Sequence, residues 1–372
     1  MLVSSRVHIW LLVLCLTASF FLAFNSAAQE KAQTQNPPQN PKEEKVDTIR
    51  VDTDLVSVEV EVTDQNRMRY AQKLKAEDFV VYEDGVRQKV SNFSTTEVPF
   101  NLVLLLDTSG SAHEELGLMQ KAARRFLNEL RPADRVAIIQ FNQEVELIKD
   151  LTTDRAKLEK ALGQITGGSG TSFYDALQLS LDEVFRKAAG RKAIVALTDG
   201  VDSYGFNTYD QILPNLERAG VALYFLELDT EEFTEARMML SCTEPKHFRF
   251  SRKQLKKYFD EFVGGGNRSD YEDHCKLERM EKMQINRRLY EAAHNELREM
   301  AEKTGGHIHP VKSLQQLEPA YAQIAEQLRT QYSLAYYPAN EKHDGQWRTL
   351  RVEVKKPGLT ATTKPGYRAP RE

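Results

Sequence analysis

The stretch Val103-Leu104-Leu105-Leu106-Asp107-Thr108-Ser109-Gly110-Ser111 decides the fold that this sequence predicts. Four apolar residues in a row are typical of a strand that is buried on both faces of a parallel sheet. The polar loop after them then lies at the carboxyl end of that strand, where open α/β sheets bind their ligands. An amphipathic helix follows, and its apolar residues form one stripe: Leu116, Met119, Ala123, Phe126, Leu127 and Leu130.

The alternation of strand-like and helix-like segments continues to residue 328. Further strands are predicted at residues 136–141, 193–197, 221–226 and 307–310. Further helices are predicted at residues 155–165, 174–189, 209–219, 289–304 and 314–328, and Gly305-Gly306 provides a C-terminal cap for the fourth of them. Strands separated by helices imply right-handed crossovers, so we predict an α/β fold with a doubly wound, mostly parallel sheet.

Two flanking segments have β character. Residues 51–62 largely alternate apolar and polar side chains, which is the period of a strand. Glu83-Asp84-Gly85 is a hairpin signal between two short apolar runs. Strand-like patterns return at residues 332–337 and 347–354. We therefore expect a small all-β region built from residues 47–97 together with the returning strands.

The first residues predict export. Arg6 and His8 precede an apolar stretch from Ile9 to Phe24, and small residues follow it as far as Ala28. This pattern is typical of a signal peptide cut after Ala28. The alternative is a retained membrane anchor, but residues 9–24 are shorter than the roughly 20 residues that span a bilayer. We expect a secreted or periplasmic protein without a stable membrane span after cleavage.

The composition narrows the functional classes. The 372 residues include 41% hydrophobic and 28% charged residues, with 50 Lys+Arg against 54 Asp+Glu and a formal net charge of −4. Nucleic-acid binding is a poor expectation without a basic excess, and a collagen-like, coiled-coil or wholly disordered chain is excluded.

The composition also changes along the chain, which predicts its domain organisation. The predicted parts are a signal peptide 1–28, a disordered Pro-rich linker 29–46, an N-terminal β region 47–97, an α/β domain 98–331, and C-terminal β strands and tail 332–372. Residues 230–284 are charged and too long for an ordinary connection, so we expect an insertion or a lid there.

Oxygen-bearing side chains stand at three separate loops of the α/β domain. Asp107, Ser109 and Ser111 follow the first buried strand, Thr171 lies in a glycine-rich loop before a helix, and Asp199 closes another apolar strand. Oxygen ligands without thiol or imidazole favour a hard divalent cation, Mg²⁺ or else Mn²⁺ or Ca²⁺. We predict that these five residues form one metal site.

In order and context, Asp107-x-Ser109-x-Ser111, Thr171 and Asp199 match the metal-ion-dependent adhesion site of von Willebrand factor type A domains. The chain resembles that family over residues 99–331. The chain also resembles secreted bacterial proteins related to this family. The segments that carry this resemblance include KLKAEDFVVYEDGVRQKVSNF, IAEQLRTQYSLAYYP and DGQWRTLRVEV. In sites of this kind the serine hydroxyls bind the cation directly, while one or both aspartates usually act through water.

The resemblance implies a binding function and no catalysis. The expected function is divalent-cation-dependent adhesion or assembly, in which the cation captures an Asp or Glu carboxylate of an unknown protein ligand. The alternative is a metal-dependent phosphatase with Asp107 as the nucleophile. That chemistry would require a second Asp two residues on as general acid, and Ser109 stands there.

The cysteines allow one pairing. Cys15 lies in the predicted signal peptide, so the mature chain would keep Cys242 and Cys275. An oxidising compartment permits a disulfide between them, and the sequence leaves open whether it forms. His274 beside Cys275 suggests Zn²⁺ only weakly, because one Cys and one His fall short of a structural zinc site.

The remaining polar candidates have ordinary structural interpretations. His307 and His309 would share one strand face but lack a third metal ligand. Loop or helix-start capping is expected of Asp175, Asp202 and Ser203, and a solvated helix face of Arg252, Lys253, Lys256 and Lys257.

Overall fold

The computed structural model describes residues 55–64, 74–94, 98–110, 116–244, 246–264 and 274–371. The predicted signal peptide, the predicted linker and Ser111 lie outside these residues. Among the described residues, no helix is both long and apolar enough to cross a membrane.

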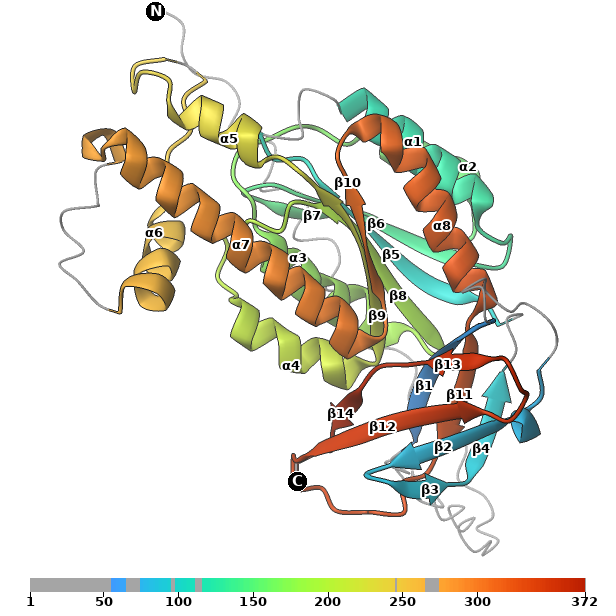
Figure 1. Ribbon diagram of the computed structural model, residues 1–372. Helices are drawn as coiled ribbons and strands as arrows, with labels where there is room; N and C mark the ends of the chain where they lie inside the picture. Colours follow the sequence, from blue (N-terminus) through green and yellow to red (C-terminus); the bar gives the residue numbers. More distant parts are fainter. Residues whose placement is uncertain are drawn as a thin grey trace, which may run out of the picture. The chain divides into compact units, whose positions relative to one another are not determined.

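A six-stranded sheet forms the centre of the α/β domain (Figure 1). Its order is β10-β9-β8-β5-β6-β7, and all neighbours are parallel except β6 and β7. The strands are β5 (Phe100–Asp107), β6 (Arg135–Phe141), β7 (Val145–Thr152), β8 (Arg191–Thr198), β9 (Val221–Leu228) and β10 (His307–Val311). The chain thus has the predicted doubly wound, mostly parallel sheet.

Helices cover both faces of this sheet, because each central strand is apolar on both sides (Figure 1). One face is covered by α1 (Leu116–Glu129), α2 (Arg155–Leu162) and α8 (Leu317–Thr330), the other by α3 (Phe173–Leu179), α4 (Tyr209–Ala219) and α7 (Arg279–Thr304). As predicted, α7 ends at Gly305, whose φ of 78° is the left-handed cap conformation.

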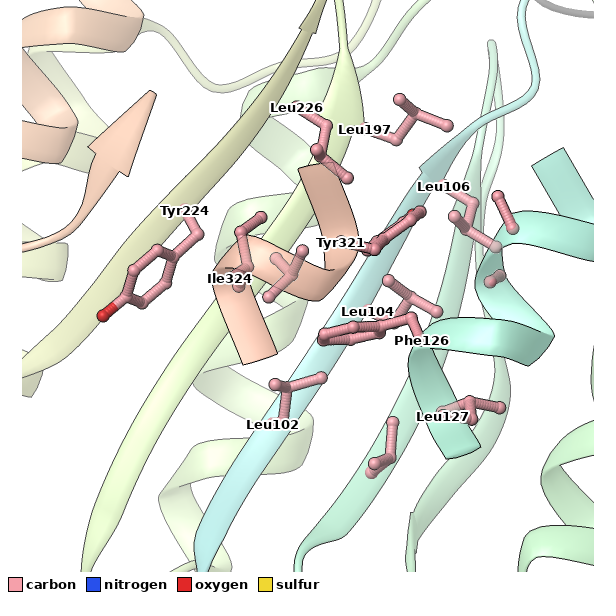
Figure 2. Close-up of a cluster of buried hydrophobic side chains, with 14 of the residues drawn as sticks. Leu102, Leu104, Leu106, Phe126, Leu127, Leu197, Tyr224, Leu226, Tyr321 and Ile324 are labelled. Carbon is pink, nitrogen blue, oxygen red and sulfur yellow. The ribbon is translucent and has the colours of Figure 1, made fainter. Parts of the chain in front are cut away.

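The core under α1 and α8 is built around an aromatic pair (Figure 2). Phe126 of α1 stacks on Tyr321 of α8 with ring centroids 4.8 Å apart, and both side chains are buried. Leu102, Leu104 and Leu106 of β5 lie beneath them in the same cluster. These contacts join two helices that are far apart in the sequence to the strand that carries the site.

Two elements differ from the sequence-based expectation. The helix predicted at residues 174–189 ends as α3 at Leu179 and continues as a π turn (Ser180–Val184) and a 3-10 turn (Phe185–Lys187). The Ser180 hydroxyl donates to the Ala176 carbonyl at 2.7 Å, a bond that perturbs regular helix geometry. The edge strand β7 was not predicted, because its half-exposed side chains form no continuous apolar run.

The β region consists of two four-stranded antiparallel sheets, β13-β1-β11-β4 and β14-β12-β2-β3. Their strands are β1 (Val56–Thr63), β2 (Phe79–Glu83), β3 (Val86–Gln88), β4 (Val90–Ser94), β11 (Tyr332–Tyr336), β12 (Trp347–Val354), β13 (Thr360–Thr362) and β14 (Gly366–Arg368). Each sheet combines N-terminal and C-terminal strands, as expected. Asp84 and Gly85 form the predicted hairpin turn with φ of 47° and 78°.

Residues 230–284 contain α5 (Glu231–Met238) and α6 (Arg252–Tyr258), and α7 begins within them at Arg279. They form a small core of their own against α7, with Met238, Phe250, Leu255 and Phe259 buried beside Ile285 and Leu289. The sequence predicted a helix face at residues 252–257, where α6 lies, but it did not predict α5.

Replacing Phe126 by alanine should lower the free energy of unfolding by about 3–5 kcal/mol, because it removes a fully buried ring and its stacking contact with Tyr321. Urea unfolding monitored by circular dichroism measures this change. Leu118→Ala on the same helix is the matched control: Leu118 is 37% exposed, so a change within about 0.5 kcal/mol is expected. Equal losses in the two variants would contradict the described packing.

Candidate metal centre

The site lies where the order of the central sheet reverses. The chain leaves β5 for β6 on one side and later returns through β8 on the other, so the ends of β5 and β8 meet at a topological switch point. Leu106 pairs with Leu197 across these strands, which brings Asp107 and Asp199 to neighbouring positions at the same sheet edge. The two carboxylates therefore belong to one site.

Asp107 is buried and held in a fixed orientation. It is 2% exposed, its Oδ2 accepts a hydrogen bond from the Thr198 hydroxyl at 2.9 Å, and its Oδ1 accepts from the Ser109 N–H at 3.0 Å. Burial, together with the smaller effect of the nearby Asp199 carboxylate, raises the pKa of Asp107 to about 7. A buried carboxylate at this position is therefore costly to ionise without a cation.

Asp199 has a similar environment. Its Oδ1 accepts from the Val201 N–H at 3.0 Å, and its Oδ2 accepts from the Thr230 hydroxyl at 2.5 Å. The Tyr290 hydroxyl donates to the same Oδ2 at 3.4 Å. Burial raises the pKa of Asp199, while the hydrogen bond from Thr230 opposes that shift.

Backbone hydrogen bonds join the three loops around the site. The Gly168 N–H donates to the Thr108 carbonyl at 2.8 Å, which ties the glycine-rich loop to the loop after β5. The Thr171 N–H donates to the Ser203 hydroxyl at 2.8 Å, which ties the same loop to the segment after β8. The structure thus brings the loops of Asp107, Ser109, Thr171 and Asp199 together, and all four residues are buried.

These residues fit a hard divalent cation. Within the described part of the chain, the hydrogen bonds to Asp107 and Asp199 come from hydroxyl and backbone N–H groups, and neither carboxylate pairs with a lysine or arginine. Two neighbouring buried carboxylates with raised pKa values and no cationic side chain are compensated well by a bound cation. The accompanying hydroxyl oxygens suit Mg²⁺, Mn²⁺ or Ca²⁺.

Thr230 and Tyr290 are functional candidates that the sequence did not reveal. Thr230 lies just before α5 and Tyr290 lies within α7, and their hydroxyls are 2.9 Å apart. They reach Asp199 only through the fold, since Tyr290 follows Asp199 by 91 residues. No local pattern distinguishes them from other hydroxyl residues of this segment.

The insertion reaches the loop after β5. A Cβ atom placed on Gly110 would lie 3.2 Å from the Phe248 ring, so glycine allows this close approach. Phe248 is half-buried. Residues 230–284 therefore border the candidate metal centre through Phe248 and Thr230.

The expectation of a solvated basic face on α6 is wrong for two of its four residues. Lys253 pairs with Asp202 and donates to the carbonyls of Tyr204 and Asn207 at 2.7 and 2.8 Å. Lys257 pairs with Glu296 of α7. Both lysines have ion-pair partners because α6 packs between the loop after β8 and α7, whereas Arg252 and Lys256 are exposed.

The capping residues have longer-range partners than expected. The Asp175 carboxylate accepts from the N–H groups of Phe206 and Asn207 and so holds the loop after β8. Asp202 accepts from the Tyr174 N–H at the start of α3 at 3.4 Å.

The two histidines of the predicted strand face have different partners, and the two cysteines bond to each other. His307 pairs with Glu61 at 2.9 Å and His309 with Gln327 at 3.1 Å, so the two rings have different partners. Cys242 and Cys275 form a disulfide that closes residues 242–275 within the insertion.

The chain has a doubly wound α/β domain with two buried aspartates, Asp107 and Asp199, at its switch point. Residues 101–261 match the family model of the von Willebrand factor type A domain. The chain therefore contains a von Willebrand factor type A domain, as the motif predicted.

Two curated relatives match part of this chain. One is an uncharacterized protein of Borreliella burgdorferi, 25% identical over 145 residues, or 36% of this chain and 42% of that protein. The other is the uncharacterized protein YfbK of Escherichia coli, 25% identical over 148 residues, or 37% of this chain and 26% of YfbK. The match thus spans less than half the length of each relative.

Several solved structures are similar to this chain at low identity. A conserved hypothetical protein, BatB of Bacteroides thetaiotaomicron, is 16% identical with a TM-score of 0.38 and covers 62% of this chain and 98% of that one. A von Willebrand factor type A protein of Catenulispora acidiphila is 12% identical with a TM-score of 0.41, covering 85% and 73%. Proximal thread matrix protein 1 of the mussel byssus, with a zinc-occupied MIDAS motif, is 13% identical with a TM-score of 0.40, covering 65% and 48%.

Lys253→Ala should lower the free energy of unfolding by about 2 kcal/mol or more, because the Asp202 side chain, 4% exposed, loses its charged partner. Urea unfolding measures the change. Lys256→Ala is the matched control on the exposed face of α6, where a change within about 0.5 kcal/mol is expected. A loss at Lys253 no larger than at Lys256 would contradict the docking of α6 on the loop after β8.

Proposed function

We propose that this protein binds a protein ligand through a divalent cation, Mg²⁺ in the first instance, held by Asp107, Ser109, Ser111, Thr171 and Asp199. The observation that carries the proposal is the pair of buried carboxylates, Asp107 and Asp199, at the ends of β5 and β8. Among the residues that the structure describes, the donors to these carboxylates are all neutral. Membership of residues 101–261 in the von Willebrand factor type A domain family supports it.

The donor set explains why such a cation would recognise a carboxylate. Hydroxyl groups supply no formal charge, so a cation held by them and by aspartates that act through water stays electrophilic and keeps an exchangeable water. An Asp or Glu side chain of a partner protein can replace that water. The resulting contact requires the metal and depends strongly on orientation, which suits reversible adhesion or assembly.

The proposal includes export to the periplasm or the cell exterior. It is supported by the signal-peptide pattern of residues 1–28 and by the disulfide between Cys242 and Cys275, because disulfides persist mainly in oxidising compartments.

Mg²⁺ or Mn²⁺ should raise the melting temperature of the chelator-treated protein, because an ion that binds only the folded state stabilises it. Binding at one hundred times the dissociation constant corresponds to about 2.7 kcal/mol. Differential scanning calorimetry with and without EDTA measures the shift. Asp107→Ala and Asp199→Ala should abolish it, whereas Asp210→Ala on the exposed face of α4 should retain it. An unchanged shift in the Asp107 variant would contradict the proposed site.

Partner binding should depend on the same residues. In affinity capture from a native extract, a protein retained in Mg²⁺ should be lost with EDTA and with Asp107→Ala, but not with Asp210→Ala. A set of retained proteins that chelation leaves unchanged would contradict the metal bridge. Hydrolysis of a model phosphate ester that disappears in Asp107→Asn would instead establish the phosphatase alternative.

A further inference from the structure

The insertion contains a group of metal-ligating atoms outside the candidate metal centre. Cys242 lies in the loop after α5, His247 five residues further on, and Cys275 in a 3-10 turn (His274–Lys276) just before α7. One ligand atom from each of these residues lies within 4.8 Å of the other two. We name Cys242, His247 and Cys275 the thiol–imidazole cluster.

The histidine faces the sulfur atoms. His247 Nε2 is 3.4 Å from Cys242 Sγ, close to the separation of about 3.5 Å that two ligand atoms have around a tetrahedral Zn²⁺. The His274 ring packs edge-on against His247 with centroids 5.1 Å apart, and it also contacts Phe250. His247 is thus held beside the sulfurs by packing as well as by its own segment.

We propose that the reduced form of this protein binds one Zn²⁺ through Cys242 Sγ, Cys275 Sγ and His247 Nε2, with water in the fourth position. Two thiolates and one imidazole are a donor set that prefers Zn²⁺ strongly over Mg²⁺ and Ca²⁺. The cluster therefore differs in ion preference from the oxygen-rich centre at Asp107. This inference does not depend on the proposed function.

The disulfide and the zinc ion use the same sulfur atoms and exclude each other. A dithiol reductant converts the Cys242–Cys275 disulfide into two thiols and becomes a cyclic disulfide itself. Zn²⁺ then binds as the two thiols lose their protons, so two protons leave for each ion bound. Either state joins the segment around residue 242 to the start of α7, one by a covalent bond and one by the metal.

Zinc binding by the full chain tests the proposal. The protein carries Asp107→Ala and Asp199→Ala, which removes the carboxylates of the oxygen-rich centre, and it is reduced with a phosphine that is then removed without oxygen. Competition against a chromophoric zinc chelator should give one Zn²⁺ per reduced chain, and none when the disulfide is intact. Equal zinc binding by the oxidised and reduced proteins would overturn the proposal.

Variants separate the cluster from adventitious binding. His247→Ala should weaken zinc binding at least tenfold, and His309→Ala, which changes a histidine bonded to Gln327 elsewhere, should leave it unchanged. Co²⁺ gives a second measurement, because thiolate-to-cobalt charge-transfer absorption should appear with the reduced protein and disappear with Cys275→Ser. A His247 variant that binds Zn²⁺ as tightly as its parent, or Co²⁺ without thiolate absorption, would overturn the assignment.

The rate at which the disulfide re-forms tests the proposal on the unmodified protein. Zn²⁺ should slow the re-formation of the disulfide under air, because the metal-bound sulfurs are less available for oxidation. Mg²⁺ should have no effect. Oxidation rates that are the same with and without Zn²⁺ would contradict the shared use of the two sulfurs.

Discussion

The structure depends on one electrostatic constraint: two aspartates that the sheet buries side by side. Asp107 and Asp199 end neighbouring parallel strands, β5 and β8, whose apolar residues fill the core on both faces. The Asp199 carboxylate adds to the cost of ionising the buried Asp107. Among the described residues, the groups that offset this cost are hydroxyl and N–H donors such as Thr198 and Thr230. We propose that a divalent cation completes this site.

The insertion is part of the surroundings of this site. Thr230 at its start donates to Asp199, and the Phe248 ring lies against Gly110 in the loop after β5. Its position is fixed by the Lys253 contacts with the loop after β8 and by the disulfide at Cys242. A change in the insertion is therefore expected to reach the candidate metal centre through Thr230 and Phe248.

The central part of the fold and the family could be predicted from the sequence, because buried parallel strands such as residues 103–106 produce continuous apolar runs and the site motif follows them directly. The edge strand β7 escaped prediction because its half-exposed side chains lack that signal. The partners of Asp199 escaped for another reason: Tyr290 approaches it only through the packing of α7. Likewise, the ion pair of Lys253 with Asp202 could not be predicted, because only the packing of α6 brings the two residues together.

Anomalous diffraction from crystals soaked in Mn²⁺ tests the central claim most directly. The account predicts a single strong peak at the sheet edge among the oxygen atoms of Asp107, Ser109, Thr171 and Asp199, and its loss from crystals of an Asp199→Ala protein. Full occupancy by Mn²⁺ at another place, with no peak between Asp107 and Asp199, would contradict it.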